Sequence, residues 1–165
     1  MNWIDVILFT IMAGAVLLEM KRGFGRTIFD FAALLVTMRL VSMLLPGLSH
    51  SIKLAADPHI NEARLYVLSF ILIGGLLLSL GKLIYDTTLV SADTFDALLG
   101  GIFGFGVGLM LCHALVKAIA LTAGPNAIPD VIANSAFGTE FLTFQSYHDL
   151  MHTLYNLDRD ETIVQ

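Results

Sequence analysis

Four long runs of apolar residues dominate this sequence and decide what the chain can fold into. They cover residues 4–20, 27–45, 65–83 and 98–122. A helix that crosses a bilayer needs about 20 mostly apolar residues, and each run is close to that length. The runs are too long for strands, lack a two-residue alternation and are rich in Leu, Ala and Met. We therefore expect an all-α membrane protein with four transmembrane helices.

The composition agrees with a chain that lives in lipid. Of the 165 residues, 56% are hydrophobic and 14% are charged, and the mean hydropathy is +0.79. A soluble domain has about 25% charged residues, so polar side chains are too few to coat a globule in water. The net charge is −5 and no basic patch with interleaved aromatic residues exists, so we expect no nucleic-acid partner. Asp5 stands where a cleaved signal peptide would be basic, so the first run is expected to stay.

Proline and glycine suggest where the helices stop. Pro46 and Gly47 are expected to end the second helix, leaving a surface loop of roughly twenty residues with a turn at Asp57-Pro58. Gly124 and Pro125 are expected to end the fourth helix. Residues 1–124 would then form the transmembrane domain, and residues 125–165 a separate tail.

The tail carries the pattern of an amphipathic helix. Apolar residues recur at spacings of three and four, which places them on one helical face. These residues are Phe137, Phe141, Phe144, Tyr147 or His148, Met151 and Tyr155. A C-terminal amphipathic helix of this kind would lie in the membrane interface or cover one end of the bundle.

A short basic bend separates the first two apolar runs. It contains Lys21, Arg22 and Arg26. Because cytoplasmic loops are enriched in Lys and Arg, the bend is expected to anchor that side in the cytosol. Lys82 adds a fourth basic residue on the same side, whereas Lys53 and Arg64 lie on the other. This bias predicts a multi-pass protein of the bacterial inner membrane with both termini in the periplasm.

Small residues at fixed spacing mark the fourth apolar run. Gly100, Gly104 and Gly108 are four residues apart and share a helical face, which allows another helix to approach closely in lipid. Gly75 and Ser79 in the third run offer a matching small face. Two interpretations remain open: packing within one bundle, or a seam between copies of the chain around a pore. Gly106 is expected to add flexibility.

Three basic or titratable residues lie inside the apolar runs: Arg39, His113 and Lys117. A charge near the bilayer centre costs at least about 2.5–3.5 kcal/mol. Arg39 could extend its guanidinium to the interface, or it could line a pathway or pair with a partner. Together the three side chains could line a polar cavity that attracts anions. By contrast Asp5, Glu19 and Asp30 lie near helix ends, where we expect carboxylates to be solvated.

No pattern in the chain predicts covalent chemistry. Cys112 is the single cysteine, which excludes an internal disulfide and a CxxC motif. His148 and His152 have a spacing that can bind metal, but Asp149 replaces the Glu of a zinc-protease motif and no third ligand follows. The stretch "GGIFGFGVG" follows no strand, so it is not a dinucleotide loop. We expect no catalytic residue, cofactor or metal, and a protein that is not an enzyme.

Three motifs, taken in order, resemble the colicin V production protein (CvpA) family. They are a Trp-Ile-Asp near the N-terminus, an Arg-Gly-Phe-x-Arg bend after the first helix, and an Asp-x-Leu-Leu-Gly-x-x-Phe-Gly-x-x-x-Gly start to the fourth helix. The chain departs from the family at Ala97 and Val107, where Arg is frequent. The matching residues are Trp3, Ile4 and Asp5; Arg22, Gly23, Phe24 and Arg26; and Asp96, Leu98, Leu99, Gly100, Phe103, Gly104 and Gly108.

The resemblance implies a bacterial inner-membrane protein needed for colicin V production and linked to the envelope. It carries no established catalytic residues. Some relatives place a periplasmic protease after such a four-helix domain, which implies a tail outside the cytoplasm. We expect an accessory role in toxin production or export, or in envelope homeostasis. The alternative is a small channel or transporter subunit whose fourth helix lines a pore. Expected partners are membrane lipid and either further copies of the chain or an envelope or secretion protein.

Overall fold

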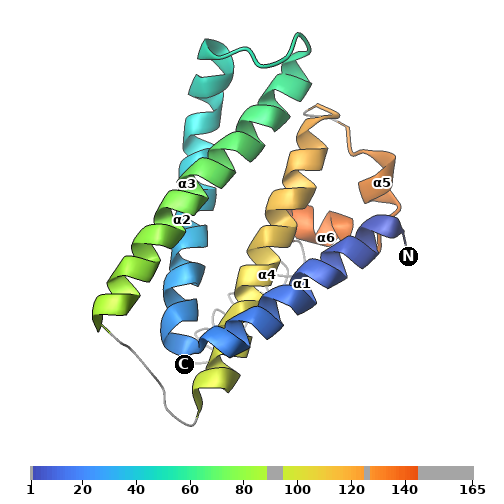
Figure 1. Cartoon of the computed structure of the whole chain (residues 1–165). Helices are drawn as coiled ribbons and strands as arrows, with labels where there is room; N and C mark the ends of the chain where they lie inside the picture. Colours follow the sequence, from blue (N-terminus) through green and yellow to red (C-terminus); the bar gives the residue numbers. More distant parts are fainter. Residues whose placement is uncertain (1, 89–94, 125–126, 145–165) are drawn as a thin grey trace, which may run out of the picture.

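Within its described residues, the chain forms four long helices followed by two short ones (Figure 1). The computed structural model describes residues 2–88, 95–124 and 127–144. Each of the four long helices is long and apolar enough to cross a membrane. The prediction of an all-α membrane protein with four transmembrane helices is therefore confirmed. The helices are α1 Trp3–Arg22, α2 Phe24–Ser51, α3 Pro58–Thr88, α4 Asp96–Leu121, α5 Asp130–Ala133 and α6 Gly138–Thr143.

The second helix does not stop at Pro46, so that prediction is wrong. Helix α2 runs through Pro46 to Ser51. A proline inside a helix removes one backbone hydrogen bond and costs about 3 kcal/mol. Leu45 and Leu48 on either side of it pack into a cluster with Tyr66 of α3, and this burial offsets the loss.

The expected twenty-residue loop between the second and third helices is also wrong. Both helices extend into that stretch, and only residues 52–57 connect them. Asn61 organises the connection: its side chain accepts from the amides of Leu54 and Ala55 at 2.5 and 3.2 Å and donates to the Ile52 carbonyl at 3.0 Å. The Asp57 carboxylate accepts from the His59 amide at 2.8 Å, as a helix-capping residue does.

Helix α4 is the central element of the bundle. It packs extensively against α1 and α2 and more lightly against α3, whereas α3 packs mainly against α2. Figure 1 accordingly shows α1 beside α4 and α2 beside α3. The α1–α4 contact holds a fully buried cluster of Ile4, Leu8, Cys112 and Val116, to which Ile132 of α5 is added.

The outer faces of the long helices are apolar. Phe9, Leu72, Leu83 and Ile102 are each more than half exposed. Large exposed apolar surface on many neighbouring residues marks a surface that is not covered by water. Together with the helix lengths, it identifies a multi-pass membrane protein.

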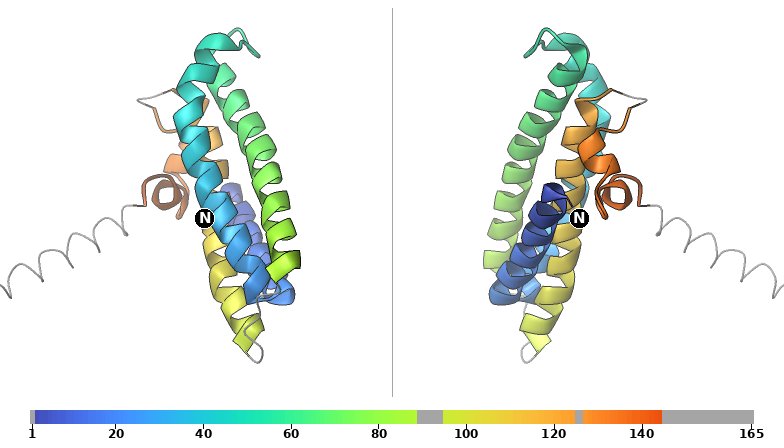
Figure 2. Two further views of the ribbon diagram at one scale, coloured as in Figure 1. Left: turned by 90° about the vertical axis from the view of Figure 1, so that its left-hand side faces the viewer. Right: turned by 90° about the vertical axis from the view of Figure 1, so that its right-hand side faces the viewer.

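The chain after α4 folds back against the bundle. Helices α5 and α6 lie beside the N-terminal half of α1 and the end of α4 (Figures 1 and 2). Phe141 and Leu142 pack against the cluster around Ile132. The predicted C-terminal amphipathic helix falls mostly on residues 145–165, which lie outside the described residues, and it stays a prediction.

Candidate functional site

The glycine face of α4 is occupied by α1. A Cβ added at Gly100 would lie 2.7 Å from the Glu19 carbonyl oxygen, and one at Gly104 would lie 2.7 Å from the Glu19 Cβ. A Cβ at Gly108 would lie 2.7 Å from the Met12 sulfur. Real Cβ atoms do not approach other atoms this closely, so these glycines let two helix backbones meet within one chain.

Two other helices also carry or meet glycines that were singled out from the sequence. Gly106 has a role in packing, because a Cβ there would lie 2.5 Å from the Phe31 ring of α2, and its expected flexibility stays a prediction. On α3, Gly74 rather than Gly75 faces α2: its Cβ would meet Thr37 at 3.4 Å, whereas nothing lies within 4 Å of Gly75. The small face that contains Gly75 is therefore not used in contacts with α2, and its role in a seam between copies stays a prediction.

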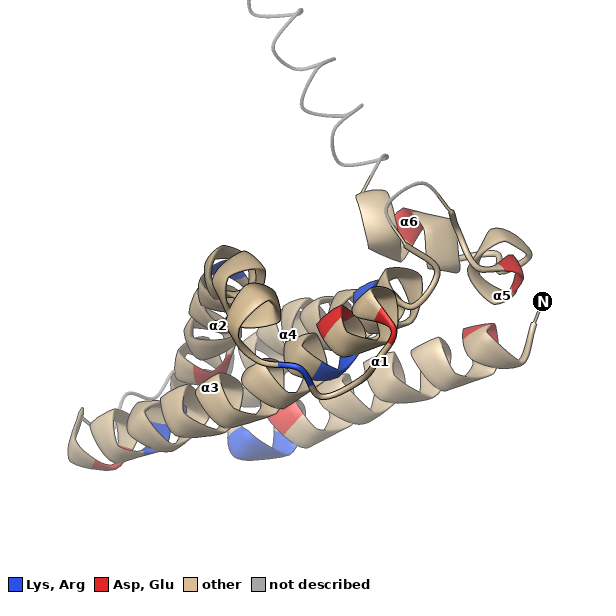
Figure 3. Cartoon of the chain, turned by 90° about the horizontal axis from the view of Figure 1, so that it is seen from above, with Lys and Arg blue, Asp and Glu red and all other residues tan. Residues whose placement is uncertain are grey.

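The basic bend is part of an ion-pair cluster, the α1–α2 corner. The Arg22 guanidinium lies 2.9 Å from the Glu19 carboxylate and 3.1 Å from that of Asp30. Arg26 lies 3.1 Å from Asp30, and the Thr27 hydroxyl donates to Glu19 at 3.0 Å. In Figure 3, basic and acidic segments adjoin at this end of α1. The bend therefore also joins α1 to α2.

The acids of this corner are not solvated, which corrects the expectation from the sequence. Glu19 and Asp30 are 3% and 1% exposed. Lys21 is exposed, and the Arg22 side chain is 45% exposed. Each buried carboxylate has an arginine partner in its own helix, Arg22 for Glu19 and Arg26 for Asp30, and the reversal at Gly23 brings Arg22 onto Asp30 as well.

The structure gives a packing role to two residues of the family motifs, Gly23 and Asp96. Gly23 has φ +82°, and a Cβ there would overlap the Asp96 carboxylate. That carboxylate accepts a hydrogen bond from the Phe24 amide at 3.1 Å, so the start of α4 is tied to the α1–α2 corner.

Asp5 joins the N-terminus of α1 to the chain that follows α4. Its carboxylate is 1% exposed and accepts from the Ser135 hydroxyl at 2.5 Å. It also accepts from the amides of Asn2, Ala136 and Phe137 at 2.6, 3.3 and 3.3 Å. We call this set the Asp5 clasp. The sequence placed Asp5 in a solvated helix end, and only the fold shows that residues 135–137 return to it.

No hydrogen bond or ion pair joins the three residues of the predicted polar pathway within the described part of the chain. Arg39 lies on the exposed face of α2. The His113 ring lies 2.6 Å from the Phe141 carbonyl oxygen and stacks on Phe144 with ring centres 5.1 Å apart. The Lys117 ammonium donates to the Ser42 hydroxyl of α2 at 3.1 Å, and it is close enough to His113 to act on it electrostatically.

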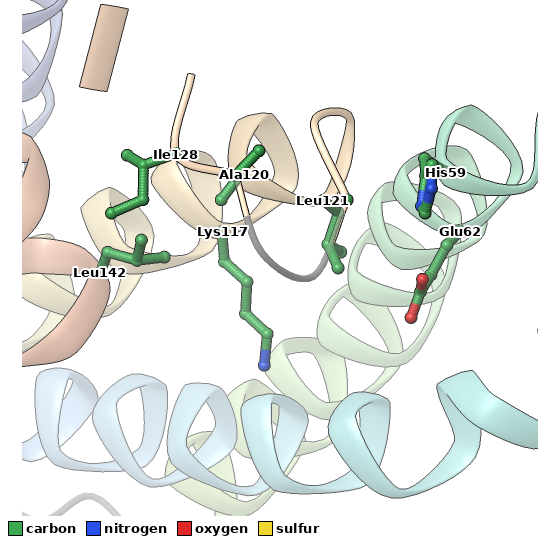
Figure 4. Close-up of a pocket in the computed structure, with 9 residues that line it drawn as sticks. His59, Glu62, Lys117, Ala120, Leu121, Ile128 and Leu142 are labelled. Carbon is green, nitrogen blue, oxygen red and sulfur yellow. The ribbon is translucent and has the colours of Figure 1, made fainter. Parts of the chain in front are cut away.

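Lys117 lines the cavity that we regard as the candidate binding site (Figure 4). This cavity has a volume of about 630 Å³ and opens between α3, α4 and the chain after α4. Glu62 and His59 of α3 also line it, and the remaining wall is mostly apolar. The Lys117 ammonium also lies 5.5 Å from the centre of the Tyr66 ring, a cation–π contact. The apolar wall residues include Ala120, Leu121, Ala127, Ile128 and Leu142.

The described part of the chain contains no cluster of metal ligands, and its one cysteine is buried. Across residues 2–88, 95–124 and 127–144, no three His, Cys, Asp or Glu side chains gather as metal ligands. His148 and His152 lie outside the described residues. The Cys112 thiol is fully buried and donates to the Leu8 carbonyl at 3.4 Å.

Comparison with known proteins gives one result. The model of the family described as "Colicin V production protein" matches residues 4–146. This match covers most of the chain and confirms the resemblance drawn from its motifs. No curated protein and no solved structure matches.

Proposed function

The chain belongs to the colicin V production protein family, and from this premise we propose that it is an accessory protein without covalent chemistry. It works in the bacterial inner membrane, in toxin production or export or in envelope homeostasis. In this role it would act by binding another membrane protein rather than by transforming a substrate.

The observation that carries this proposal is the position of Arg39. It stands near the middle of α2 on an exposed face shared with Val36, Leu40 and Met43. Within the described part of the chain, no ion pair or hydrogen bond reaches its guanidinium. A charge on a lipid-facing helix costs at least about 2.5–3.5 kcal/mol near the bilayer centre. A partner helix that offers a carboxylate or free carbonyl oxygens to Arg39 would remove that cost.

The proposed orientation places the α1–α2 corner in the cytosol and both termini in the periplasm. The pairing of Arg22 and Arg26 with Glu19 and Asp30 does not weaken this reasoning. Orientation follows the number of Lys and Arg residues near the membrane ends, and acidic residues contribute little. Lys21 and Lys82 add to the same side.

The test is purification of the complex from native membranes in mild detergent, with determination of its mass. Arg39→Leu should release the partner, because it removes the charge while keeping an apolar face. Arg39→Lys should retain it in part, since a cation remains. Met43→Leu, one turn along the same face, is the matched control. Toxin output and envelope integrity should fall with the partner. A complex of unchanged mass from the Arg39→Leu variant would refute the role of this face.

A second candidate function is a small channel or transporter subunit, and the Lys117 cavity is the observation in its favour. The glycine face of α4 meets α1, so a pathway along α4 would follow the side of Lys117 instead. Purified protein in liposomes should then move ions or solute, and Lys117→Ala should abolish the flux. Silent liposomes together with a partner held by Arg39 would select the accessory role.

A further inference from the structure

Two opposite charges face the Lys117 cavity without pairing. Lys117 reaches into it from α4 and Glu62 from α3, toward the space that these helices share with α2 (Figure 4). Glu62 is close enough to act electrostatically on Lys117. Yet no ion pair joins the two among the described residues, and no hydrogen bond from them reaches the Glu62 carboxylate. The lysine has three donors, and the Ser42 hydroxyl takes one.

The residues around this pair hold the ammonium in place. Ser42 of α2 accepts from it at 3.1 Å, and the Tyr66 ring of α3 lies 5.5 Å below it. Residues of three helices, α2, α3 and α4, thus contribute to the position of this cation. Glu62 is partly buried, so its carboxylate also lacks full contact with water. Partly desolvated charges that do not touch favour a ligand able to meet both.

The cavity has the size and lining of a small-molecule site. Its volume of about 630 Å³ falls within the range of about 300–1,000 Å³ that is typical of ligand pockets. Apolar residues form most of the wall, and few polar groups converge in it. A simple anion would be repelled by Glu62, and a simple cation would be repelled by Lys117.

We propose that this cavity binds a zwitterion whose anionic group meets Lys117 and whose primary ammonium meets Glu62. The head of phosphatidylethanolamine has this chemistry, and so do free phosphoethanolamine and free amino acids. Such a ligand would bind independently of the partner proposed for Arg39.

Two experimental arms distinguish the sources. In the first, the full-length protein is placed in phosphatidylcholine nanodiscs with added phosphatidylethanolamine or phosphatidylglycerol, and native mass spectrometry counts the retained lipids. Phosphatidylcholine has no N–H to donate to Glu62, and phosphatidylglycerol has no cation. In the second, free phosphoethanolamine, alanine or inorganic phosphate is titrated against the detergent-purified protein, and the unfolding midpoint is followed.

Preferred retention of phosphatidylethanolamine would show that the ligand is a lipid. Stabilisation by phosphoethanolamine or alanine, without preferred lipid retention, would show that the ligand is a soluble solute. In either case Lys117→Gln and Glu62→Gln should each weaken binding about tenfold or more, because each removes one charge-assisted contact. Lys117→Arg should retain binding in part. Lys53→Gln, in the exposed connection between α2 and α3, is the control for loss of a positive charge.

Three results would overturn the assignment. One is the absence of binding in both arms. Another is equal binding of inorganic phosphate or phosphatidylglycerol, which would make this a plain anion site. The third is binding that both glutamine variants leave unchanged. If Lys117→Gln does not fold, the binding measured for Glu62→Gln still tests whether the cavity holds a zwitterion.

Discussion

Removal of the Asp5 carboxylate should release the chain after α4 from the bundle. In the Asp5 clasp, one carboxylate receives the Ser135 hydroxyl at 2.5 Å and the amides of Ala136 and Phe137 at 3.3 Å. A hydrogen bond to a charged group contributes about 1.5–3 kcal/mol, and the two longer contacts contribute less. Local opening of residues 130–138 should therefore rise about tenfold to a hundredfold in Asp5→Ala, because each 1.4 kcal/mol is a factor of ten.

The measurement is hydrogen exchange by mass spectrometry on the full-length protein in nanodiscs. Peptides that cover residues 130–138 should lose protection, whereas those from the middle of α2 and α3 should not. Asp5→Asn tests the reason: its amide oxygen can still accept from Ser135, but its NH₂ group cannot accept from a backbone amide. It should fall between the wild type and Asp5→Ala. Asp86→Asn, on the exposed end of α3, is the control. Unchanged protection of residues 130–138 in Asp5→Ala would refute the clasp.

Three further predictions concern the bundle itself. Gly104→Leu should destabilise the protein by about 1–3 kcal/mol or more, because the new side chain overlaps α1. Gly75→Leu, with open space around it, should not destabilise the protein, and thermal unfolding in detergent compares the two variants. Arg26→Leu should cost about 1.5–3 kcal/mol, because the buried Asp30 loses one charged partner and keeps Arg22, and the double variant Arg26→Leu/Asp30→Leu should recover part of the loss; equal stability of single and double variants would contradict this. Neutral replacement of the whole basic bend should scramble the orientation of the helices, and tag accessibility that stays unchanged would remove its orienting role; the residues to replace are Lys21, Arg22 and Arg26.

The sequence was sufficient to predict the four membrane-spanning helices, because hydrophobic length is a local property. It was not sufficient to predict where they end: the apolar run stops near Pro46, but α2 continues because Leu48 packs near Tyr66 of α3. The glycine spacing on α4 indicated a close helix contact, and the fold showed that its partner is α1. On α3 the spacing could not select between Gly74 and Gly75 as the residue that meets α2, because neighbouring residues on one helix point in different directions and only the tertiary contact decides.

The largest gap between sequence and structure concerns the acidic residues. Each was expected to be solvated because it lies near a helix end, and hydropathy contains no term for a partner far along the chain. Asp5 meets Ser135 only because the chain after α4 returns to it. The reversal at Gly23 brings Asp30 onto Arg22, whereas Glu19 and Arg22 pair within α1 and Arg26 and Asp30 pair within α2. One feature of the sequence could have predicted their burial. The chain has few charged residues, yet three of its acids stand within its apolar helices.

The charges of the membrane region divide into two groups by what they contact. Those of the α1–α2 corner and the Asp5 clasp are met by other groups of the same chain, so their removal should change stability first. Arg39 has no partner in the described part of the chain, and the Glu62 and Lys117 pair faces a cavity. Because an unmatched charge in lipid is costly, such positions are the ones where binding from outside the chain would contribute most. Variants at Arg39 and Glu62 should therefore alter binding while leaving the unfolding midpoint of the unbound protein nearly unchanged, the reverse of variants at Asp5 and Asp30. Lys117 lies between the two groups, because its loss also removes the contacts with Ser42 and Tyr66.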